Sequence, residues 1–289
     1  MKKTLTAIAL AGSLGTAQAR DVLMSDYPST ATISHVISEN PSTTESIRLF
    51  LQPKTYNEGN FELPNGYSLI GDNSIIVGST EVRGNNQLEN IYWIKDVEGQ
   101  SYKAIRIRGR DISEGDNVLI DSNSFIGSDY TGDGIAVTQD HATSITVQNC
   151  YFTRLRNAIL VEAPNGGKKF RNNIIEDNYR GFYSRGNTDF GTEEEHGNNI
   201  LYGNELIAII DRRGTRGSND VDFAQYNYIY DKQGNLLRSE EEILPYVQLV
   251  TDGARGSNPY VIFEPTNTVP HPDYPDNNNS RITNWEVYQ

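Results

Sequence analysis

A short pattern returns about every 25 residues through the middle of this 289-residue chain. In each return an asparagine is closely followed by apolar or aromatic residues, and a small residue followed by an apolar one recurs in step with it. The asparagines are Asn123, Asn149, Asn172, Asn198 and Asn227, and the small residues are Ala104, Gly134, Ala158, Gly181 and Ala208. Two motifs that repeat in phase indicate one supersecondary unit stacked on itself.

Each repeat is rich in β-branched and aromatic residues separated by Gly, Asn, Asp and Ser, which is typical of strands and turns rather than helices. Within one repeat, Ile105 and Ile107 alternate with Arg106 and Arg108. Because successive strand side chains point to opposite faces, the isoleucines should fill the interior and the arginines should face outward. Coils of about 25 residues with two or three strands predict an all-β fold, a single right-handed parallel β-helix.

Stacking the coils on these motifs predicts two columns of outward side chains. The first column is Arg106, Ala136, Leu160, Tyr183 and Ile210, and the second is Arg108, Thr138, Glu162, Arg185 and Arg212. The recurring asparagines suit turns, because Asn tolerates left-handed conformations and bonds to nearby backbone. In stacked coils their amides would also form a ladder, each side chain bonding to the next.

The first 19 residues have the pattern of a secretory signal peptide. Lys2 and Lys3 precede a short apolar run, and Ala17-Gln18-Ala19 is a typical cleavage signal. The run is too short to span a bilayer, and the rest of the sequence has no stretch that is apolar enough to do so. We therefore expect cleavage after Ala19 and a soluble monomer, periplasmic or secreted, without membrane insertion.

The remaining chain divides into a repeat region and a tail. Residues 20–231 are predicted to form the β-helix domain, and residues 232–289 an irregular C-terminal cap. Repeat arrays need end caps that shield the core. The segment from Thr32 to Glu39 has apolar residues at helical spacing and is predicted to be an N-terminal cap helix, and a second helix is expected to begin near Ser239.

Two segments depart from the repeat. Residues 20–30 are expected to be an irregular lead-in, and residues 84–103 an inserted loop or an irregular coil. The single cysteine, Cys150, lies inside the repeat and cannot form an internal disulfide. We expect it to be a small buried apolar residue.

The formal net charge is −13, and losing Lys2 and Lys3 with the leader would take it to −15. Such a surface disfavours nucleic acid, which demands patches of Lys and Arg. An anionic polysaccharide is not excluded, because local basic patches can bind against the net charge.

Five segments of the chain form a distinctive set: Thr32-Ile33, Lys54-Thr55-Tyr56-Asn57-Glu58, Gly66-Tyr67-Ser68-Leu69-Ile70-Gly71, Asp189-Phe190-Gly191 and Gly197-Asn198-Asn199. Together they resemble the secreted, pectate-lyase-like parallel β-helix proteins that are grouped as a bacterial domain of unknown function. The resemblance covers about residues 30–231. This family has no agreed activity. Enzymes with this fold usually work on the outward face of one sheet: lyases use an Arg or Lys base and carboxylate-bound Ca²⁺, and glycosidases use pairs of Asp.

The outward columns therefore supply the candidate site residues. If the protein cleaves its substrate, we expect lyase chemistry at Arg185 and Arg212, with Asp140 and His141 close by as acid or base. The candidate substrate-binding residues are Arg108, Glu162 and Tyr183. The alternative interpretation is a solvated ladder of mixed charges that pair across coils.

No cofactor is certain from the sequence, although Ca²⁺ is an option. Asp129 and Asp133 lie in a Gly/Asp loop whose oxygens suit Ca²⁺, and Glu193-Glu194-Glu195-His196 is a second acidic cluster. Turn chemistry explains the first loop more simply, and solvation the second. The spacing is not that of an EF-hand, and the sequence contains no zinc-protease, serine-hydrolase or phosphate-loop motif.

The sequence thus predicts a carbohydrate-active β-helix protein that binds or cleaves a polysaccharide, an acidic one by preference, with β-elimination as the cleavage reaction. A glycoside hydrolase is a further option. The alternative from a different class is a non-catalytic envelope or surface protein that uses the long sheet as a binding platform.

Overall fold

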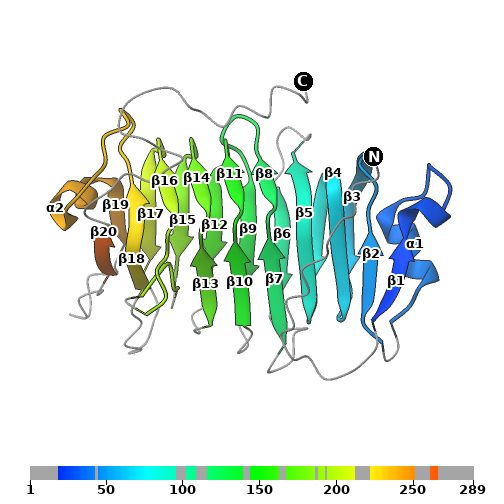
Figure 1. Cartoon of the computed structure of the whole chain (residues 1–289). Coiled ribbons are helices and arrows are strands. Elements are labelled where there is room, and N and C mark those ends of the chain that lie inside the picture. Colours follow the sequence, from blue (N-terminus) through cyan, green and yellow to red (C-terminus); the bar gives the residue numbers. More distant parts are fainter. Residues whose placement is uncertain are drawn as a thin grey trace, which may run out of the picture.

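A computed structural model describes residues 19–42, 45–95, 102–108, 116–138, 144–162, 167–185, 188–192, 194–211, 222–250 and 261–265. Within these residues the fold is predominantly β, with twenty strands in one continuous sheet. The pairings between the strands are parallel, and each strand lies beside its equivalent one repeat earlier and one repeat later (Figure 1). The predicted stacking of repeats is therefore present, and the architecture is that expected for an all-β parallel solenoid.

The strands fall into three rows along the stack. The first row contains β6 (Lys103–Arg108), β9 (Asp133–Thr138), β12 (Asn157–Val161), β15 (Arg180–Ser184), β17 (Leu206–Asp211) and β19 (Val247–Val250). The second row contains β1 (Arg20–Leu23), β2 (Ile47–Phe50), β7 (Asn117–Asp121), β10 (Ser144–Gln148) and β13 (Lys168–Arg171). The third row contains β8 (Ser124–Ile126), β11 (Tyr151–Thr153), β14 (Ile174–Glu176), β16 (Ile200–Tyr202), β18 (Asp222–Ile229) and β20 (Val261–Pro265).

Three longer strands near the N-terminal end pass from one row into another. They are β3 (Thr55–Leu63), β4 (Tyr67–Val82) and β5 (Asn86–Ile94). Two short α-helices complete the described structure, α1 (Ile33–Glu39) and α2 (Glu240–Ile243), together with the 3₁₀ turns Met24–Asp26 and Leu244–Tyr246. No helix among the described residues is long and apolar enough to cross a membrane.

Aromatic rings stack along the interior. The Trp93 and Phe125 centroids are 6.5 Å apart, and those of Phe125 and Phe152 are 4.7 Å apart, with nearly parallel ring planes. Strand pairing places these residues on successive coils of the third row. Because offset ring pairs add stability beyond the area that they bury, the stack helps to fix the register of the coils.

The recurring asparagines occupy two adjacent columns rather than one. Asn149, Asn172 and Asn198 have the predicted left-handed backbone, with φ of 54°, 54° and 50°. The amide ladder is formed by the residues that follow them. In it, Asn173 Nδ2 donates to Asn199 Oδ1 at 2.9 Å, and Asn199 Nδ2 donates to Asn227 Oδ1 at 2.8 Å. The prediction of one column failed because the turn residue and the ladder residue are both asparagine in two consecutive coils, Asn172-Asn173 and Asn198-Asn199.

The N-terminal end is closed by α1, as predicted. The Thr32 hydroxyl accepts from His35 N at 3.1 Å, which caps the helix. The Glu58 carboxylate, from β3, accepts from Ile33 N at 2.5 Å and from Ser34 N at 3.3 Å, so that a negative charge lies at the helix start. Helix and sheet are thereby joined through the Glu58 side chain.

Three expectations about segments require correction. Residues 20–30 are not irregular throughout, because β1 pairs with β2. Residues 84–103 contain the regular strand β5, whose Tyr92 and Trp93 pair with Ser124 and Phe125. The stack also continues past residue 231, where β19 and β20 pair with β17 and β18, and α2 begins at Glu240, close to where a helix was predicted. The predicted signal peptide and the last residues of the tail lie outside the described residues.

Candidate functional site

Two outward columns cross the first row, as predicted, but the register differs at the last coil. Ala208, not Ile209, stacks on Phe182, and Tyr183 pairs with Ile209. The outward positions on β17 are therefore Ile209 and Asp211 instead of Ile210 and Arg212. The alignment on the motif missed this shift, because Ala208-Ile209 fits the small-then-apolar pattern, whereas the pair in register with Gly181-Phe182 is Ile207-Ala208. Arg212, Asp140 and His141 lie outside the described residues.

The observed register places the carboxylate of Asp211 where the side chain of Arg212 was expected. Asp211 is completely buried, and its Oδ2 accepts from the Tyr183 hydroxyl and from Arg185 Nε, the latter at 3.2 Å. Arg185 itself keeps 41% of its side chain exposed. We call these three residues the Arg185 cluster.

The cluster fixes the protonation state of Arg185. Burial by itself would lower the pKa of the guanidinium, but Tyr183, the hydrogen bond and charge of Asp211, and the charge of Glu162 outweigh it and raise the pKa. A general base must lose its proton near the working pH. Arg185 is therefore a poor base in this arrangement and is held as a permanent cation.

Between the two ends of the face, three of the four outward positions are small or apolar and buried, and the fourth, Glu162, is exposed. Ala136 is 0% exposed, Thr138 4% and Leu160 6%, although strand alternation places them on the outward side. The solvated ladder of mixed charges therefore does not run unbroken through these coils, where Glu162 is the one charged outward residue. The face is divided into the Arg185 cluster toward one end and a second polar region toward the other.

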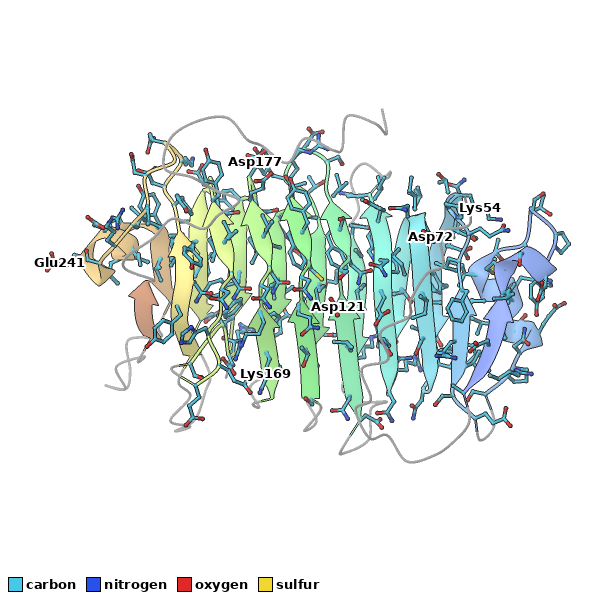
Figure 2. The ribbon with its side chains drawn as sticks, viewed as in Figure 1. Lys54, Asp72, Asp121, Lys169, Asp177 and Glu241 are labelled. Carbon is cyan, nitrogen blue, oxygen red and sulfur yellow. The ribbon has the colours of Figure 1, made fainter. Side chains whose placement is uncertain are left out.

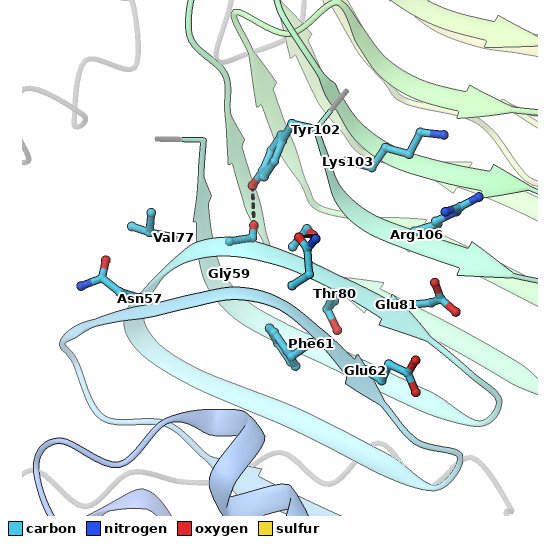
Figure 3. Close-up of a pocket in the computed structure, with 13 residues that line it drawn as sticks. Asn57, Gly59, Phe61, Glu62, Val77, Thr80, Glu81, Tyr102, Lys103 and Arg106 are labelled. Carbon is cyan, nitrogen blue, oxygen red and sulfur yellow. Dashed lines mark hydrogen bonds between the residues drawn. The ribbon is translucent and has the colours of Figure 1, made fainter. Parts of the chain in front are cut away.

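That second region is a groove of about 570 Å³ across β3, β4 and β6 (Figure 3). Its lining includes the amides of Asn57 and Asn60, the Ser79 hydroxyl and one wall of Tyr102. The Tyr102 hydroxyl donates to the Gly78 carbonyl at 2.7 Å, marked by the dashed line in Figure 3, and burial raises the pKa of Tyr102. The ring is thus fixed in place and stays neutral.

Charged side chains from neighbouring strands line one side of the groove. Figure 3 shows the charged ends of Glu62, Glu81, Lys103 and Arg106 extending to the same side of the strands. The two carboxylates are neutralised: Arg83 Nη2 lies 2.8 Å from an oxygen of each, and Arg108 Nε lies 3.1 Å from Glu81 Oε2.

The two remaining cations of the groove are not neutralised. In the described part of the chain, neither Lys103 nor Arg106 forms an ion pair, and the one polar contact of Arg106 is from Nε to Thr138 Oγ1 at 3.4 Å. A chain of net charge −13 therefore presents two uncompensated positive charges beside amides and an aromatic ring. This combination suits a ligand that carries both hydroxyls and carboxylates.

Asp133 and Glu195, two of the Ca²⁺ candidates, are engaged by other side chains, and Glu193 lies outside the described residues. Asp133 is 0% exposed and accepts a bidentate pair from Arg156, from Nε to Oδ1 at 3.1 Å and from Nη2 to Oδ2 at 2.8 Å, and a further bond from Asn157 Nδ2 at 2.6 Å. Glu195 pairs with Lys169 at 2.5 Å. No group of three or more His, Cys, Asp or Glu suited to a metal is found in the ranges that the structure describes. Cys150 is buried as expected, and burial raises the pKa of its thiol to about 12.

Sequence reasoning found Arg108, Glu162, Tyr183 and Arg185 on this face, but it missed Tyr102 and Lys103. The alternation in Lys-Ala-Ile-Arg-Ile-Arg from Lys103 puts Arg106 and Arg108 on one side of β6, but it does not place Lys103 with them, because Lys103 is out of phase with both. Tyr102 and Lys103 were also missed because residues 84–103 were assigned to an inserted loop or an irregular coil. No family model, curated protein or solved structure matches the chain.

Proposed function

We propose that the protein is an exported right-handed parallel β-helix that binds an acidic polysaccharide on the outward face of the first row and does not cleave it there. The observation that carries the proposal is the groove with its unpaired Lys103 and Arg106. Export rests on the signal-peptide pattern of residues 1–19 and on the pectate-lyase-like resemblance of the repeat region.

The groove chemistry favours a sugar acid over other ligands. Arg and Lys bind carboxylates through charge-assisted hydrogen bonds, and Arg106 offers a planar fork for two parallel bonds. Asn57, Asn60 and Ser79 supply the donors and acceptors that sugar hydroxyls require. An open groove of about 570 Å³ accommodates part of a longer polymer rather than enclosing a small molecule.

Binding is favoured over β-elimination because the predicted base, Arg185, is unsuited to that role in the described structure. Arg185 is held as a cation by buried Asp211. In the groove, Glu62 and Glu81 are each 2.8 Å from Arg83 and are engaged as its ion partners. The face therefore serves recognition, and Arg108 contributes by holding Glu81.

The decisive experiment measures binding to polygalacturonate, alginate, hyaluronate and neutral dextran by calorimetry, with product analysis by mass after long incubation. The Lys103→Ala/Arg106→Ala variant should lose roughly tenfold or more in affinity for the carboxylated polymers, since each charge-assisted contact contributes about 1.5–3 kcal/mol. Arg48→Ala/Lys169→Ala removes the same charge from the outward side of the second row and should bind normally.

Three outcomes would contradict the proposal. Unsaturated products from the wild type would show a lyase, and hydrated fragments a hydrolase. Equal losses in the groove variant and the second-row variant would show that only net charge matters. Absence of binding to every carboxylated polymer would remove the acidic polysaccharide as the ligand.

A further inference from the structure

The chain turns a corner from the third row into the first row just before each first-row strand. The residues at equivalent corner positions, one before each strand, are Tyr102, Gly132, Arg156, Tyr179 and Glu205. Tyr102 is the wall of the groove. The corner therefore runs from the groove along the stack of coils. Tyr102 precedes β6 and Tyr179 precedes β15, and these two strands are three strand spacings apart, about 14 Å.

Two tyrosines stand out from this corner. Tyr130 is 46% exposed and Tyr179 is 41% exposed, and few large apolar side chains of the described residues are exposed to this degree. The Tyr130 hydroxyl donates to Asp177 Oδ1 at 2.7 Å, across two coils of the stack. Figure 2 shows Asp177 at the upper edge of the molecule, on the turn that leads into β15. We call Tyr130 and Tyr179 the tyrosine corner.

Two residues that lead into the corner have a backbone conformation that is unfavourable for their side chains. Asp129 and Tyr130 have φ of 52° and 56°, in the left-handed region that favours Gly and Asn. A bulky side chain costs free energy there, and such strain persists where the surroundings impose it, commonly at binding sites. The loop is held by Thr131, whose hydroxyl donates to the Ser128 carbonyl at 2.8 Å and accepts from Lys95 Nζ.

Polar groups border each ring. The Arg180 guanidinium lies over one face of the Tyr179 ring, 4.8 Å from its centre, and Arg180 Nη1 is 3.4 Å from Asn157 Oδ1. Asp177 holds the Tyr130 hydroxyl. Isolated rings among charged and amide groups do not resemble a protein interface, whose core is apolar and depleted of charge. They match a sugar, which offers an apolar face for stacking and hydroxyl edges for hydrogen bonds.

We infer that Tyr130 and Tyr179 are stacking platforms for sugar rings, so that the polysaccharide continues from the groove along the corner, parallel to the stack of coils. This inference rests on the proposed function of the groove. It predicts that affinity grows with ligand length, because a short oligosaccharide fills the groove alone and a longer one also reaches the tyrosine corner.

The test compares trimers and nonamers of galacturonate and of alginate, measured by calorimetry on the chain without its leader. Tyr179→Ala and Tyr130→Asn should each weaken nonamer binding roughly threefold to tenfold and leave trimer binding unchanged, since an aromatic contact contributes about 0.5–1.5 kcal/mol. Leu244→Ala, at a residue that is 45% exposed on the turn after α2, is the matched control and should change neither.

Tyr130→Asn also separates a structural role from a binding role. Because Asn tolerates the left-handed backbone, the variant should unfold at the same urea concentration as the wild type or a higher one. Nonamer and trimer binding reduced together, or nonamer binding unchanged, would overturn the inference while leaving the groove proposal standing. No binding of either length by the wild type would refute the groove proposal itself, and this inference with it.

Discussion

The groove and the Arg185 cluster lie on the same face and contain the same kinds of residue, yet their cations are in opposite states. Lys103 and Arg106 have no ion partner within the described residues, whereas Arg185 is bound to a carboxylate that is 0% exposed. Between them lie the buried outward positions of β9 and β12, Ala136 and Leu160.

This difference shows that an outward arginine is not in itself a functional residue. A cation that contacts a buried carboxylate stabilises the fold, because removing it leaves a costly group behind. A cation without a partner contributes little to stability and remains available to a ligand. Across this face, replacing a paired cation should therefore lower stability and affect binding little. Replacing an unpaired cation should weaken binding and affect stability little.

The largest expected effect is on stability at the Arg185 cluster. Arg185→Leu should lower the free energy of unfolding by about 1.5–3 kcal/mol, the range for hydrogen bonds to charged groups, because Asp211 stays buried. Arg106→Leu, at an unpaired cation on the same face, should change it by less than about 0.5 kcal/mol. Urea unfolding at neutral pH measures both.

Cys150 offers an independent measurement of the same contrast. Its thiol is 1% exposed, so it should react with a thiol reagent only when the chain opens. If opening is fast and reversible, Arg185→Leu should speed the reaction by about tenfold to a hundredfold, and Arg106→Leu should leave its rate unchanged. Equal rates for the two variants would mean that the Arg185 cluster adds no stability.

The repeat, the alternation and the N-terminal cap helix could be predicted from sequence because each follows from local chemistry. The state of Arg185 could not. It depends on a shift of one residue between β15 and β17, which replaces Arg212 by Asp211 in the outward column. Such a shift exchanges the two faces of a strand. Neighbouring Ala208 and Ile209 both fit the interior, so only the three-dimensional pairing decides between the registers.

The pairing state of the groove cations could not be predicted from the sequence either. Its cations come from β6, but their freedom to bind depends on Arg83 and Arg108 having neutralised Glu62 and Glu81. Partners of this kind belong to different coils and are chosen by geometry, not by spacing along the chain. Sequence alone therefore predicted a face with charges on it, but not which charges were paired.

The second prediction uses salt to separate the two regions. Exposed charges are screened over about 10 Å at 0.1 M ionic strength and about 3 Å at 1 M, and buried pairs are screened much less. Affinity for polygalacturonate should therefore fall about tenfold between roughly 0.05 and 0.5 M NaCl. The stability difference between Arg185→Leu and the wild type should stay constant over the same range. Calorimetry and urea unfolding at each salt concentration provide the comparison.

A smaller effect is expected when a paired cation is converted into an unpaired one. Glu81→Gln removes the carboxylate that lies 3.1 Å from Arg108 Nε, so that Arg108 joins Lys103 and Arg106 as a cation without a partner among the described residues. Affinity for an anionic polymer should rise roughly twofold to fivefold, because one nearby charge contributes about 1 kcal/mol or less in water. The neighbouring substitution Glu62→Gln leaves Arg108 paired and should have the weaker effect. A fall in affinity with Glu81→Gln would mean that this carboxylate itself contacts the ligand.

The smallest effect is expected at a third pair, Lys169–Glu195, where both partners are exposed. The hydrogen bond from Lys169, then its charge, lowers the pKa of Glu195 below its ordinary value of 4.5. A carboxylate with a lowered pKa contributes stability above its unfolded pKa and loses it as the pH falls through the folded pKa. The contribution should therefore be complete at pH 7 and disappear in acid below pH 4.5.

Because 55% of the Glu195 side chain is exposed, Glu195→Gln should cost no more than about 0.5 kcal/mol at neutral pH. The variant and the wild type should converge in acid, as measured by urea unfolding at a series of pH values. A cost at Glu195 as large as that at Arg185 would mean that burial of the carboxylate is not what separates structural cations from available ones on this molecule.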